Sequence, residues 1–199
     1  MTSNSRALVL ASASDIRRQI LQDAGLRFRV EAADVDEESS RAAPPQEMAR
    51  TLAEAKASAV SVLNPGELVV GCDQVFTLNG EFLPKPKNRQ EVAQKLQRLS
   101  GRTHLFHCGL ALVCDGEVLR SGVERVSVQL HALSQGEIDH YAASGEGVGC
   151  AGGYQLESGG ARLIHAVNGS HFTVLGLPLH LLITYLRELD VLADLTQEK

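Results

Sequence analysis

The segment from Leu105 to Leu130 constrains the fold most, because it is typical of two long strands joined by a tight turn. Both halves are rich in apolar and β-branched residues, and Asp115-Gly116 between them is a strong hairpin signal. Such a pair is antiparallel. Elsewhere, apolar runs at 7–11, 28–32 and 68–72 alternate with helical periodicity. The sequence therefore predicts an α/β fold with a mixed sheet, not an all-parallel doubly wound sheet.

Helices are expected where apolar residues recur every three or four positions. The expected helices cover residues 16–24, 45–62, 92–99, 134–144 and 179–189. Pro45 suits the first turn of its helix, and Ser134 with Glu137 forms a capping box. Leu78 to Glu81 predicts a hairpin turn, and the five glycines within Gly145–Gly153 indicate a seam between two lobes. We expect residues 1–199 to form a single domain, in which two lobes could share one sheet.

Composition narrows the function classes. The 199 residues are 44% hydrophobic and 22% charged, which is ordinary for a globular chain with a sizeable core. The net charge of −5 argues against a general nucleic-acid binder, but an anionic small substrate fits if cations gather locally. The four cysteines include no C-x-x-C pair, which favours reduced thiols. No stretch approaches the ~20 apolar residues of a membrane span or resembles a signal peptide, so we expect no membrane association and a cytoplasmic location.

The stretch SASDIRRQIL, residues 12–21, follows an expected strand and opens a helix. Free backbone N–H groups and the positive end of the helix dipole make such a junction a natural phosphate site. Ser14 can donate a hydroxyl, and Arg17 and Arg18 can bind phosphate oxygens in a bidentate manner. A serine N-cap with two solvated arginines explains the same residues equally well.

Asp73 places a carboxylate just past the apolar strand 68–72, where α/β proteins often bind ligands. It could hold a divalent cation or take a proton from water. Lys56 lies beside the apolar helix stripe Met48, Leu52, Ala55, Ala59, Val62, and Pro86 restrains the backbone beside Lys85. The plainer alternatives are an N-cap aspartate, a lysine that snorkels along the core edge and lysines on the surface. Together, however, these groups favour a site for an anion and a metal ion.

Two further carboxylates indicate a function only if they lie beside other site residues. Glu37 lies in the acidic loop Asp36-Glu37-Glu38, which is usually just solvated but could hold Mg²⁺ opposite another carboxylate. Glu157 follows the glycine-rich stretch and could read the edge of a base. Ordinary turns would account for the same glycines.

Eight segments in order resemble the Maf family of nucleoside triphosphate pyrophosphatases, over nearly the whole chain. They are LASASDIRRQIL at the start, VDE at 35–37, KA at 56–57, GCDQV at 71–75, KP at 85–86, LSGRTH at 99–104, CAGGY at 150–154 and NGS…VLGLPL at 168–179. Each piece is weak alone, but the ordered set is specific.

The resemblance implies a two-lobed α/β fold around an elongated mixed sheet with a central nucleotide cleft, as in Maf and inosine triphosphate pyrophosphatase. It also implies a divalent cation, Mg²⁺ or Mn²⁺, and often a homodimer. The implied reaction splits a nucleoside triphosphate between the α- and β-phosphates. Asp73 matches the proton acceptor of the family, and the other polar cleft residues match Ser14, Arg17, Glu37, Lys56 and Lys85. From their chemistry, Glu37 and Asp73 would hold the metal, and Arg17, Lys56 and Lys85 would neutralise the phosphates.

Three positions indicate a branch of the family. The branch that prefers dTTP and UTP carries Arg, Thr and Gln where this chain has Ile16, Gln74 and Glu157. The residues found here resemble the branch that acts on 7-methyl-GTP. A Glu carboxylate can accept hydrogen bonds from both donors of a guanine edge, and it favours the positive charge that N7-methylation adds. A pyrophosphatase with loose base choice, or a non-catalytic protein that regulates cell division, remain the alternatives.

Overall fold

The structure, a computed structural model, describes residues 7–36 and 43–196. By its internal contacts the chain divides into two compact units. Unit 1 contains the described residues up to Asp73, then Cys108–Glu124, then those from Gly176 on. Unit 2 contains Gln74–His107 and Arg125–Leu175. In the described part of the chain no helix is long and apolar enough to cross a membrane.

The described strands form one seven-stranded mixed sheet in the order β2-β1-β3-β5-β6-β7, with β4 paired to β3. The strands are β1 (Leu8–Ala11), β2 (Arg29–Val30), β3 (Leu68–Leu78), β4 (Glu81–Phe82), β5 (Thr103–Cys114), β6 (Glu117–Leu130) and β7 (Ile164–Asn168). β1 pairs in parallel with β2 and β3, whereas β4 and β7 pair antiparallel with their neighbours. The expected mixed-sheet α/β fold is confirmed, including the strand–turn–strand segment around Asp115-Gly116.

The position of Asp73 differs from the prediction. It does not follow a strand that ends at Cys72 but lies inside β3, which continues to Leu78. Apolar residues resume directly after Asp73, and Val75, Phe76 and Leu78 are all buried. The strand can continue because the carboxylate finds a cationic partner, as described below, and does not have to leave the sheet for water.

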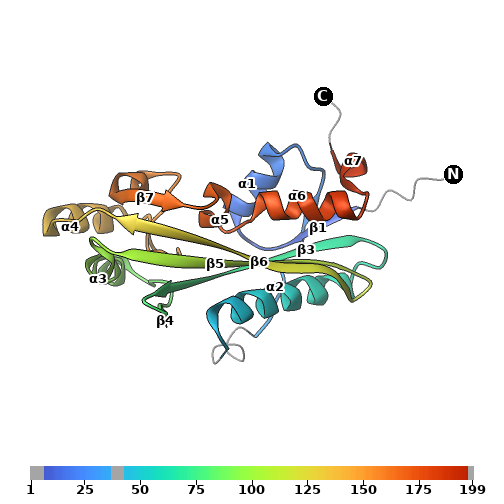
Figure 1. Cartoon of the computed structure of the whole chain (residues 1–199), viewed down its shortest axis with the longest axis horizontal. Coiled ribbons are helices and arrows are strands. Elements are labelled where there is room, and N and C mark those ends of the chain that lie inside the picture. Colours follow the sequence, from blue (N-terminus) through green and yellow to red (C-terminus); the bar gives the residue numbers. More distant parts are fainter. Residues whose placement is uncertain (1–6, 37–42, 197–199) are drawn as a thin grey trace. The chain divides into compact units, whose positions relative to one another are not determined.

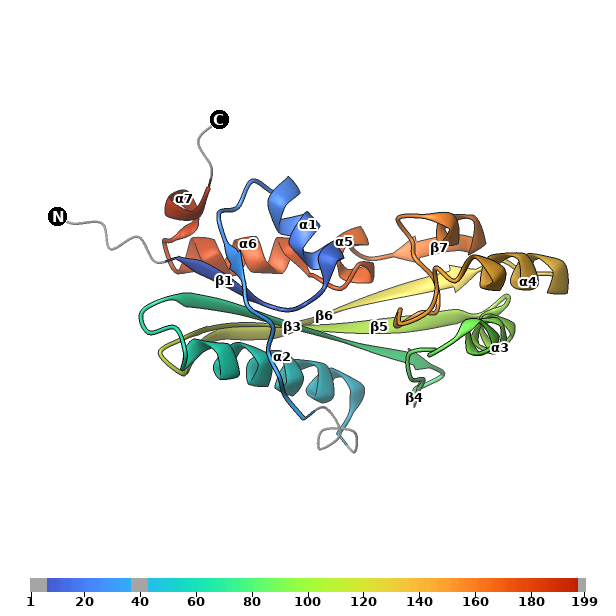
Figure 2. The same cartoon turned by 180° about the vertical axis from the view of Figure 1, so that it is seen from behind.

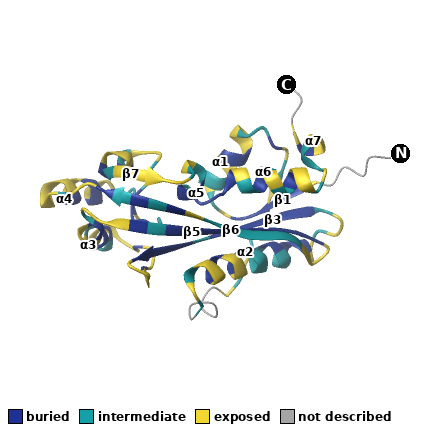
Figure 3. Cartoon of the chain, in the orientation of Figure 1, coloured by how far each residue is buried: buried dark blue, intermediate teal, exposed yellow. Residues whose placement is uncertain are grey.

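Unit 1 packs helices against the parallel strands. The helices are α1 (Asp15–Asp23), α2 (Pro45–Ser61), α6 (Leu179–Glu188) and α7 (Leu192–Leu195). Figures 1 and 2 show α2 on one face of β1 and β3, with α1 and α6 on the other. Figure 3 shows β1 and β3 buried, whereas the helices alternate between buried and exposed positions.

The buried stripe of α2 is shifted from the expected one. Met48 and Leu52 are buried as expected, but the stripe continues through Ala53, Ala57 and Val60. Ala55 and Ala59 are half-buried, and Val62 is 66% exposed. The alanine-rich sequence offers small apolar residues on several faces, so the packing against β3 selects the stripe, not the periodicity alone.

Unit 2 has its own core beneath α3 (Arg89–Leu99) and α4 (Gln135–Ser144), which lie side by side in both views (Figures 1 and 2). A short 3₁₀ helix (Gly159–Leu163) and α5 (His171–Val174) complete it. The capping box of Ser134 is present, and the turn at Asn79-Gly80 has positive φ at both residues, as predicted.

The predicted seam between lobes at Gly145–Gly153 is wrong, because the segment lies wholly inside unit 2. The chain changes units within the long strands instead, between residues 73 and 74, 107 and 108, and 124 and 125, and once more after α5, between 175 and 176. The glycines have local roles: Gly145 ends α4 with φ of 81°, and a Cβ at Gly147 would lie 2.0 Å from the carbonyl oxygen of Gly153.

Candidate functional site

A close approach of α2 to the sheet shapes the site in unit 1. A Cβ on Gly71 of β3 would lie 2.1 Å from the carbonyl oxygen of Ala53, and one on Gly109 of β5 would lie 2.0 Å from that of Ala49. Only glycine permits this contact between a helix backbone and a strand. Lys56, which lies one turn after Ala53, is thereby held against the middle of β3.

Lys56 and Asp73 form an ion pair. The Lys56 Nζ donates to Asp73 Oδ1 over 2.6 Å, and the two side chains are only 14% and 11% exposed. A charge-assisted contact that is mostly removed from water is stronger than a surface ion pair. Lys56 therefore points to Asp73 and does not simply snorkel to the surface, and Asp73 is not an N-cap.

Arg17 is held where β1 ends beside the middle of β3. Its Nε donates to Gly176 O over 2.8 Å, and its Nη1 donates to Cys72 O over 2.8 Å and to Ser12 Oγ over 3.2 Å. β1 and β3 are in parallel register, with Ala11 beside Gly71, so the end of β1 lies beside the part of β3 that directly precedes Asp73. Within the described residues, three of the five N–H donors of the guanidinium are thus used, which leaves the two on Nη2 for a ligand.

Ser14 and Arg18 have the local roles expected of a serine N-cap and a solvated arginine. Ser14 is the N-cap of α1, with its Oγ accepting the Arg17 N–H over 3.4 Å. Arg18 forms a surface ion pair with Asp15 over 2.7 Å, with 50% of the arginine side chain exposed. Ile16 is half-buried. Arg17 is therefore the one of the two arginines that α1 turns toward β3 beside Asp73.

Two hydrogen bonds hold the Gln74 side chain in unit 2. Its Nε2 donates to Thr173 O over 2.8 Å and to Val174 O over 3.0 Å. These carbonyls end α5, where helix carbonyls lack partners within the helix. The amide nitrogen is therefore occupied, and the side-chain oxygen is the group of Gln74 that could meet a ligand.

Lys85 and Glu157 lie around one thiol of unit 2. Both are exposed. Burial raises the pKa of the Cys150 thiol; a hydrogen bond with Gln155 and the charge of Lys85 oppose the rise, whereas the charge of Glu157 adds to it. Two predicted site residues from distant parts of the sequence therefore lie within electrostatic reach of the same atom.

The predicted residues fall into two groups. Ser14, Ile16, Arg17, Arg18, Lys56 and Asp73 belong to unit 1, and Gln74, Lys85 and Glu157 belong to unit 2. That the two groups form one site stays a prediction. Glu37 lies outside the described residues.

The described carboxylates are compatible with a divalent cation that the substrate helps to bind. In residues 7–36 and 43–196, no three His, Cys, Asp or Glu side chains gather as a metal site. Mg²⁺ commonly uses one or two carboxylates together with substrate phosphates and water. Lys56 engages Oδ1 of Asp73, and a carboxylate offers a second oxygen to a cation.

Sequence reasoning missed two residues. Gly71 was part of a motif, but only the packing of α2 shows why it must be glycine. Lys95 is a buried cation in unit 2. Its signal was available, because it lies at helical spacing with Val92 and Leu99, on a face where apolar residues are expected.

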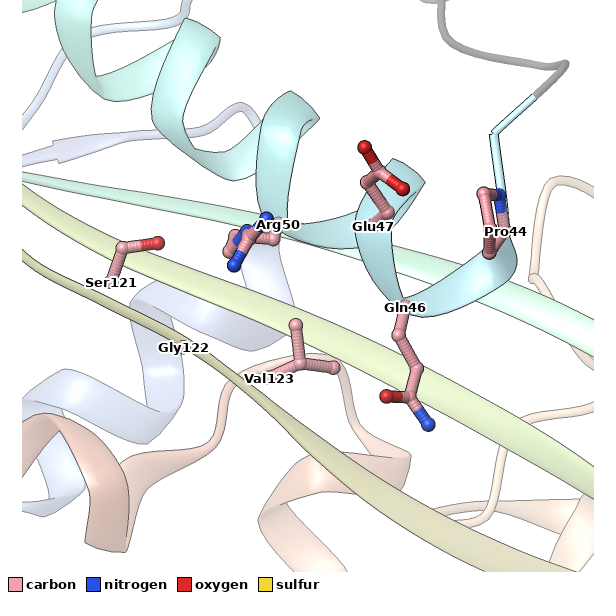
Figure 4. Close-up of a pocket in the computed structure, with 7 residues that line it drawn as sticks. All are labelled: Pro44, Gln46, Glu47, Arg50, Ser121, Gly122 and Val123. Carbon is pink, nitrogen blue, oxygen red and sulfur yellow. The ribbon is translucent and has the colours of Figure 1, made fainter.

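A separate surface pocket in unit 1 contains none of the predicted residues. It has a volume of about 460 Å³ and lies between the start of α2 and β6 (Figure 4). Its lining consists of Pro44, Gln46, Glu47, Arg50, Ser121, Gly122 and Val123.

Comparison with known proteins identifies relatives over most of the chain. The family model described as Maf-like protein matches residues 7–189. A nucleoside triphosphate pyrophosphatase of Rhodopseudomonas palustris is 40% identical over 195 residues, which cover 95% of this chain and 96% of that protein. A 7-methyl-GTP pyrophosphatase of Brucella abortus is 36% identical, covering 96% of each chain. A dTTP/UTP pyrophosphatase of Symbiobacterium thermophilum is 41% identical, covering 87% of this chain and 89% of that protein.

Among solved structures, a HAM1 protein from Coxiella burnetii covers 64% of this chain and 74% of its own. The sequence identity is 18% and the TM-score is 0.47.

Proposed function

We propose that this chain, which belongs to the Maf family, hydrolyses nucleoside triphosphates between the α- and β-phosphates and releases the monophosphate and pyrophosphate. It is then a hydrolase that acts on acid anhydrides, as the names of its relatives state for them. The observation that carries the proposal is the largely buried pair of Lys56 and Asp73. A carboxylate that a cation holds in place can act as a general base for water.

In the proposed reaction, Asp73 accepts a proton from the water that attacks the α-phosphorus. The bond from this phosphorus to the bridging oxygen breaks, and pyrophosphate leaves with the electron pair. Lys56 orients the Asp73 carboxylate, and Arg17, Lys85 and the capped start of α1 at Ser14 offset the negative charge of the phosphates. No covalent intermediate is needed.

We further propose that Asp73 and Glu37 hold a divalent cation, Mg²⁺ or Mn²⁺. The support is chemical, because both ions prefer carboxylate and phosphate oxygens. When bound, the ion would neutralise charge on the triphosphate and polarise its phosphoryl oxygens.

The test is pyrophosphate release by purified protein with Mg²⁺ and a panel of nucleoside triphosphates. We expect Asp73→Asn to lower kcat by about 10²–10⁴-fold, the usual contribution of a general base. Asp139→Asn, at an exposed position of α4, is the matched control and should retain full activity. If Asp73→Asn turns over as fast as the wild type, the proposed mechanism is wrong.

For the base, we propose a preference for 7-methyl-GTP, read by Ile16, Gln74 and Glu157. The support is chemical: Glu157 is exposed and can accept from the N1–H and N2 amine of guanine, and its charge favours a methylated, cationic base. The relatives include both a 7-methyl-GTP and a dTTP/UTP pyrophosphatase, so relatedness alone leaves the base open.

We expect Glu157→Gln to lower kcat/KM for 7-methyl-GTP at least about tenfold more than for UTP, because one charged hydrogen-bond acceptor is worth about 1.5–3 kcal/mol. Glu117→Gln, at an exposed position of β6, is the control. An equal loss on both nucleotides would remove Glu157 from base recognition.

The remaining proposals concern the setting of the reaction. We propose a cytoplasmic enzyme that clears modified or surplus nucleotides and binds no nucleic acid or membrane. A homodimer is proposed from family resemblance and can be checked by light scattering. The alternative of a non-catalytic regulator of cell division is not favoured by the relatives, which are named as enzymes.

A further inference from the structure

Lys95 places an ammonium inside the core of unit 2. The residue is 6% exposed. Its Nζ donates to the carbonyl oxygens of Ala151 over 2.6 Å, Pro84 over 2.9 Å and Leu83 over 3.4 Å. It also lies 4.2 Å from the centre of the Phe76 ring, within the range of a cation–π contact.

An apolar residue at this position would be buried at a lower cost in free energy. Lys95 lies among Val92, Leu96 and Leu99 on the buried face of α3. Taking an ammonium out of water costs several kcal/mol. Burial, assisted by the charge of Arg98, accordingly lowers the pKa of Lys95 to about 7. The three carbonyls accept hydrogen bonds from the ammonium, and these bonds offset part of the cost of burial. They also supply each carbonyl with a donor.

The three carbonyls connect two loops that carry predicted site residues. Leu83 and Pro84 directly precede Lys85, and Ala151 directly follows Cys150, which lies within electrostatic reach of both Lys85 and Glu157. On the other side of Lys85, Pro86 O accepts the Gly149 N–H over 2.8 Å. Residues on both sides of Lys85 are thus linked to the same glycine-rich segment, Gly145–Gly153, by hydrogen bonds.

The other groups around the ammonium do not compete for it. Arg98 lies one turn further along α3 and repels it. His104 of β5 is held neutral, since burial, followed by the charge of Lys95, lowers its pKa to about 3. Its Nε2 is hydrogen-bonded to the hydroxyl of Tyr154 over 2.6 Å. The donors of Lys95 are therefore directed to the loop carbonyls.

We propose that Lys95 is a positioning residue: it joins the Lys85 loop to Gly145–Gly153 and sets the direction of Lys85. The consequence for catalysis rests on the proposed function, because it requires that Lys85 binds the phosphates. The junction of the two loops does not depend on that function, so the two can be tested separately.

The test compares Lys95→Met, which keeps an unbranched apolar side chain as far as the Cε position but removes the ammonium donor, with Lys87→Met. Lys87 is exposed on the same loop, so it is a matched control. The first readout is the rate at which iodoacetamide modifies each cysteine, followed by peptide mass analysis well below the melting temperature. We expect Lys95→Met to speed the modification of Cys150 at least about fivefold and Lys87→Met to leave it unchanged.

The other cysteines report on global unfolding. Cys72, Cys108 and Cys114 are buried, and burial raises the pKa of Cys72 to about 11. They should stay protected in Lys95→Met, since only the loop junction is loosened. Faster modification of all four cysteines would indicate a general loss of structure and contradict a positioning role.

The second readout is pyrophosphate release. We expect Lys95→Met to lower kcat/KM at least about tenfold, and Lys95→Arg, which keeps a cationic donor, to restore part of it. If the wild type releases no pyrophosphate but Cys150 still becomes reactive in Lys95→Met, the proposed function fails and the junction stands. Unchanged Cys150 reactivity together with unchanged kcat/KM overturns the positioning role.

A measurement on the wild type keeps the test decisive if Lys95→Met does not fold. Amide hydrogen exchange should protect residues 147–153 to about the same extent as α3, because the ammonium links them. Exchange in that segment as fast as in an exposed loop would overturn the proposal.

Discussion

At the residue scale, Arg17 shows how one side chain can shape a site before any ligand arrives. Its guanidinium holds the carbonyl of Cys72, directly before Asp73, together with Gly176 and Ser12. The rigid fork of arginine reaches these acceptors at once, whereas the single nitrogen of lysine cannot span them. We expect that part of the effect of any Arg17 substitution is structural.

Arg17→Lys should therefore lower the free energy of unfolding by about 1–3 kcal/mol although the charge is kept, because carbonyl groups lose their donors. Urea denaturation at pH 7 measures the change. Arg18→Lys is the control, since Arg18 forms only an exposed pair with Asp15; exposed pairs contribute at most about 1 kcal/mol. Equal stability of the two variants would show that the Arg17 contacts are not stabilising.

At the element scale, the packing of α2 on β3 sets the distance between Lys56 and Asp73. The two residues are on different elements, and they meet because Gly71 lets the helix backbone approach the strand. A methyl group at that position would have to push the helix away, since backbone atoms cannot rotate aside as side chains do.

Gly71→Ala should destabilise the protein by about 3 kcal/mol, at the upper end of the usual cost of overpacking. It should also lower kcat at least about tenfold, because Lys56 would no longer hold Asp73. Gly136→Ala is the control: nothing lies within 4 Å of its added Cβ in α4, so it should be neutral or stabilising by about 0.5–1 kcal/mol. Full stability and activity of Gly71→Ala would refute this account of the site.

At the scale of the whole molecule, buried histidines make stability depend on pH on the acid side. His104 and His107 are almost fully buried, each with an Nδ1 that lacks a partner in the described part of the chain. Burial lowers the pKa of both; for His104 the value falls to about 3, with the charge of Lys95 as a further cause. The unfolded chain therefore binds protons that the folded protein does not.

The free energy of unfolding should fall as the pH drops from about 6.5 toward 3, by at most about 1.4 kcal/mol per pH unit for each histidine. Urea denaturation at pH 7, 6, 5 and 4 measures the slope. His104→Gln keeps a polar side chain but does not titrate, so its slope should be shallower. An identical slope in the variant would show that His104 does not contribute to acid lability.

Local signals were sufficient for much of the fold. The capping box at Ser134, the turn at Asn79-Gly80 and the first-turn Pro45 depend on contacts within a few residues, and each was predicted correctly. The site was partly predictable for a different reason, because its residues lie in motifs that resemble a known family.

The sequence by itself determined where the longer helices and strands lie, though not β7, α5 or α7, that the sheet is mixed, and which polar residues are candidates for chemistry. Only the tertiary structure decided that β3 runs through Asp73, that α2 buries Ala53 and Ala57, and that Lys95 lies inside the core. For Asp73 and Lys95 the physical reason is the same. A charge can stay in a strand or a core only when a distant part of the chain supplies its partner, and spacing along the sequence does not reveal that partner.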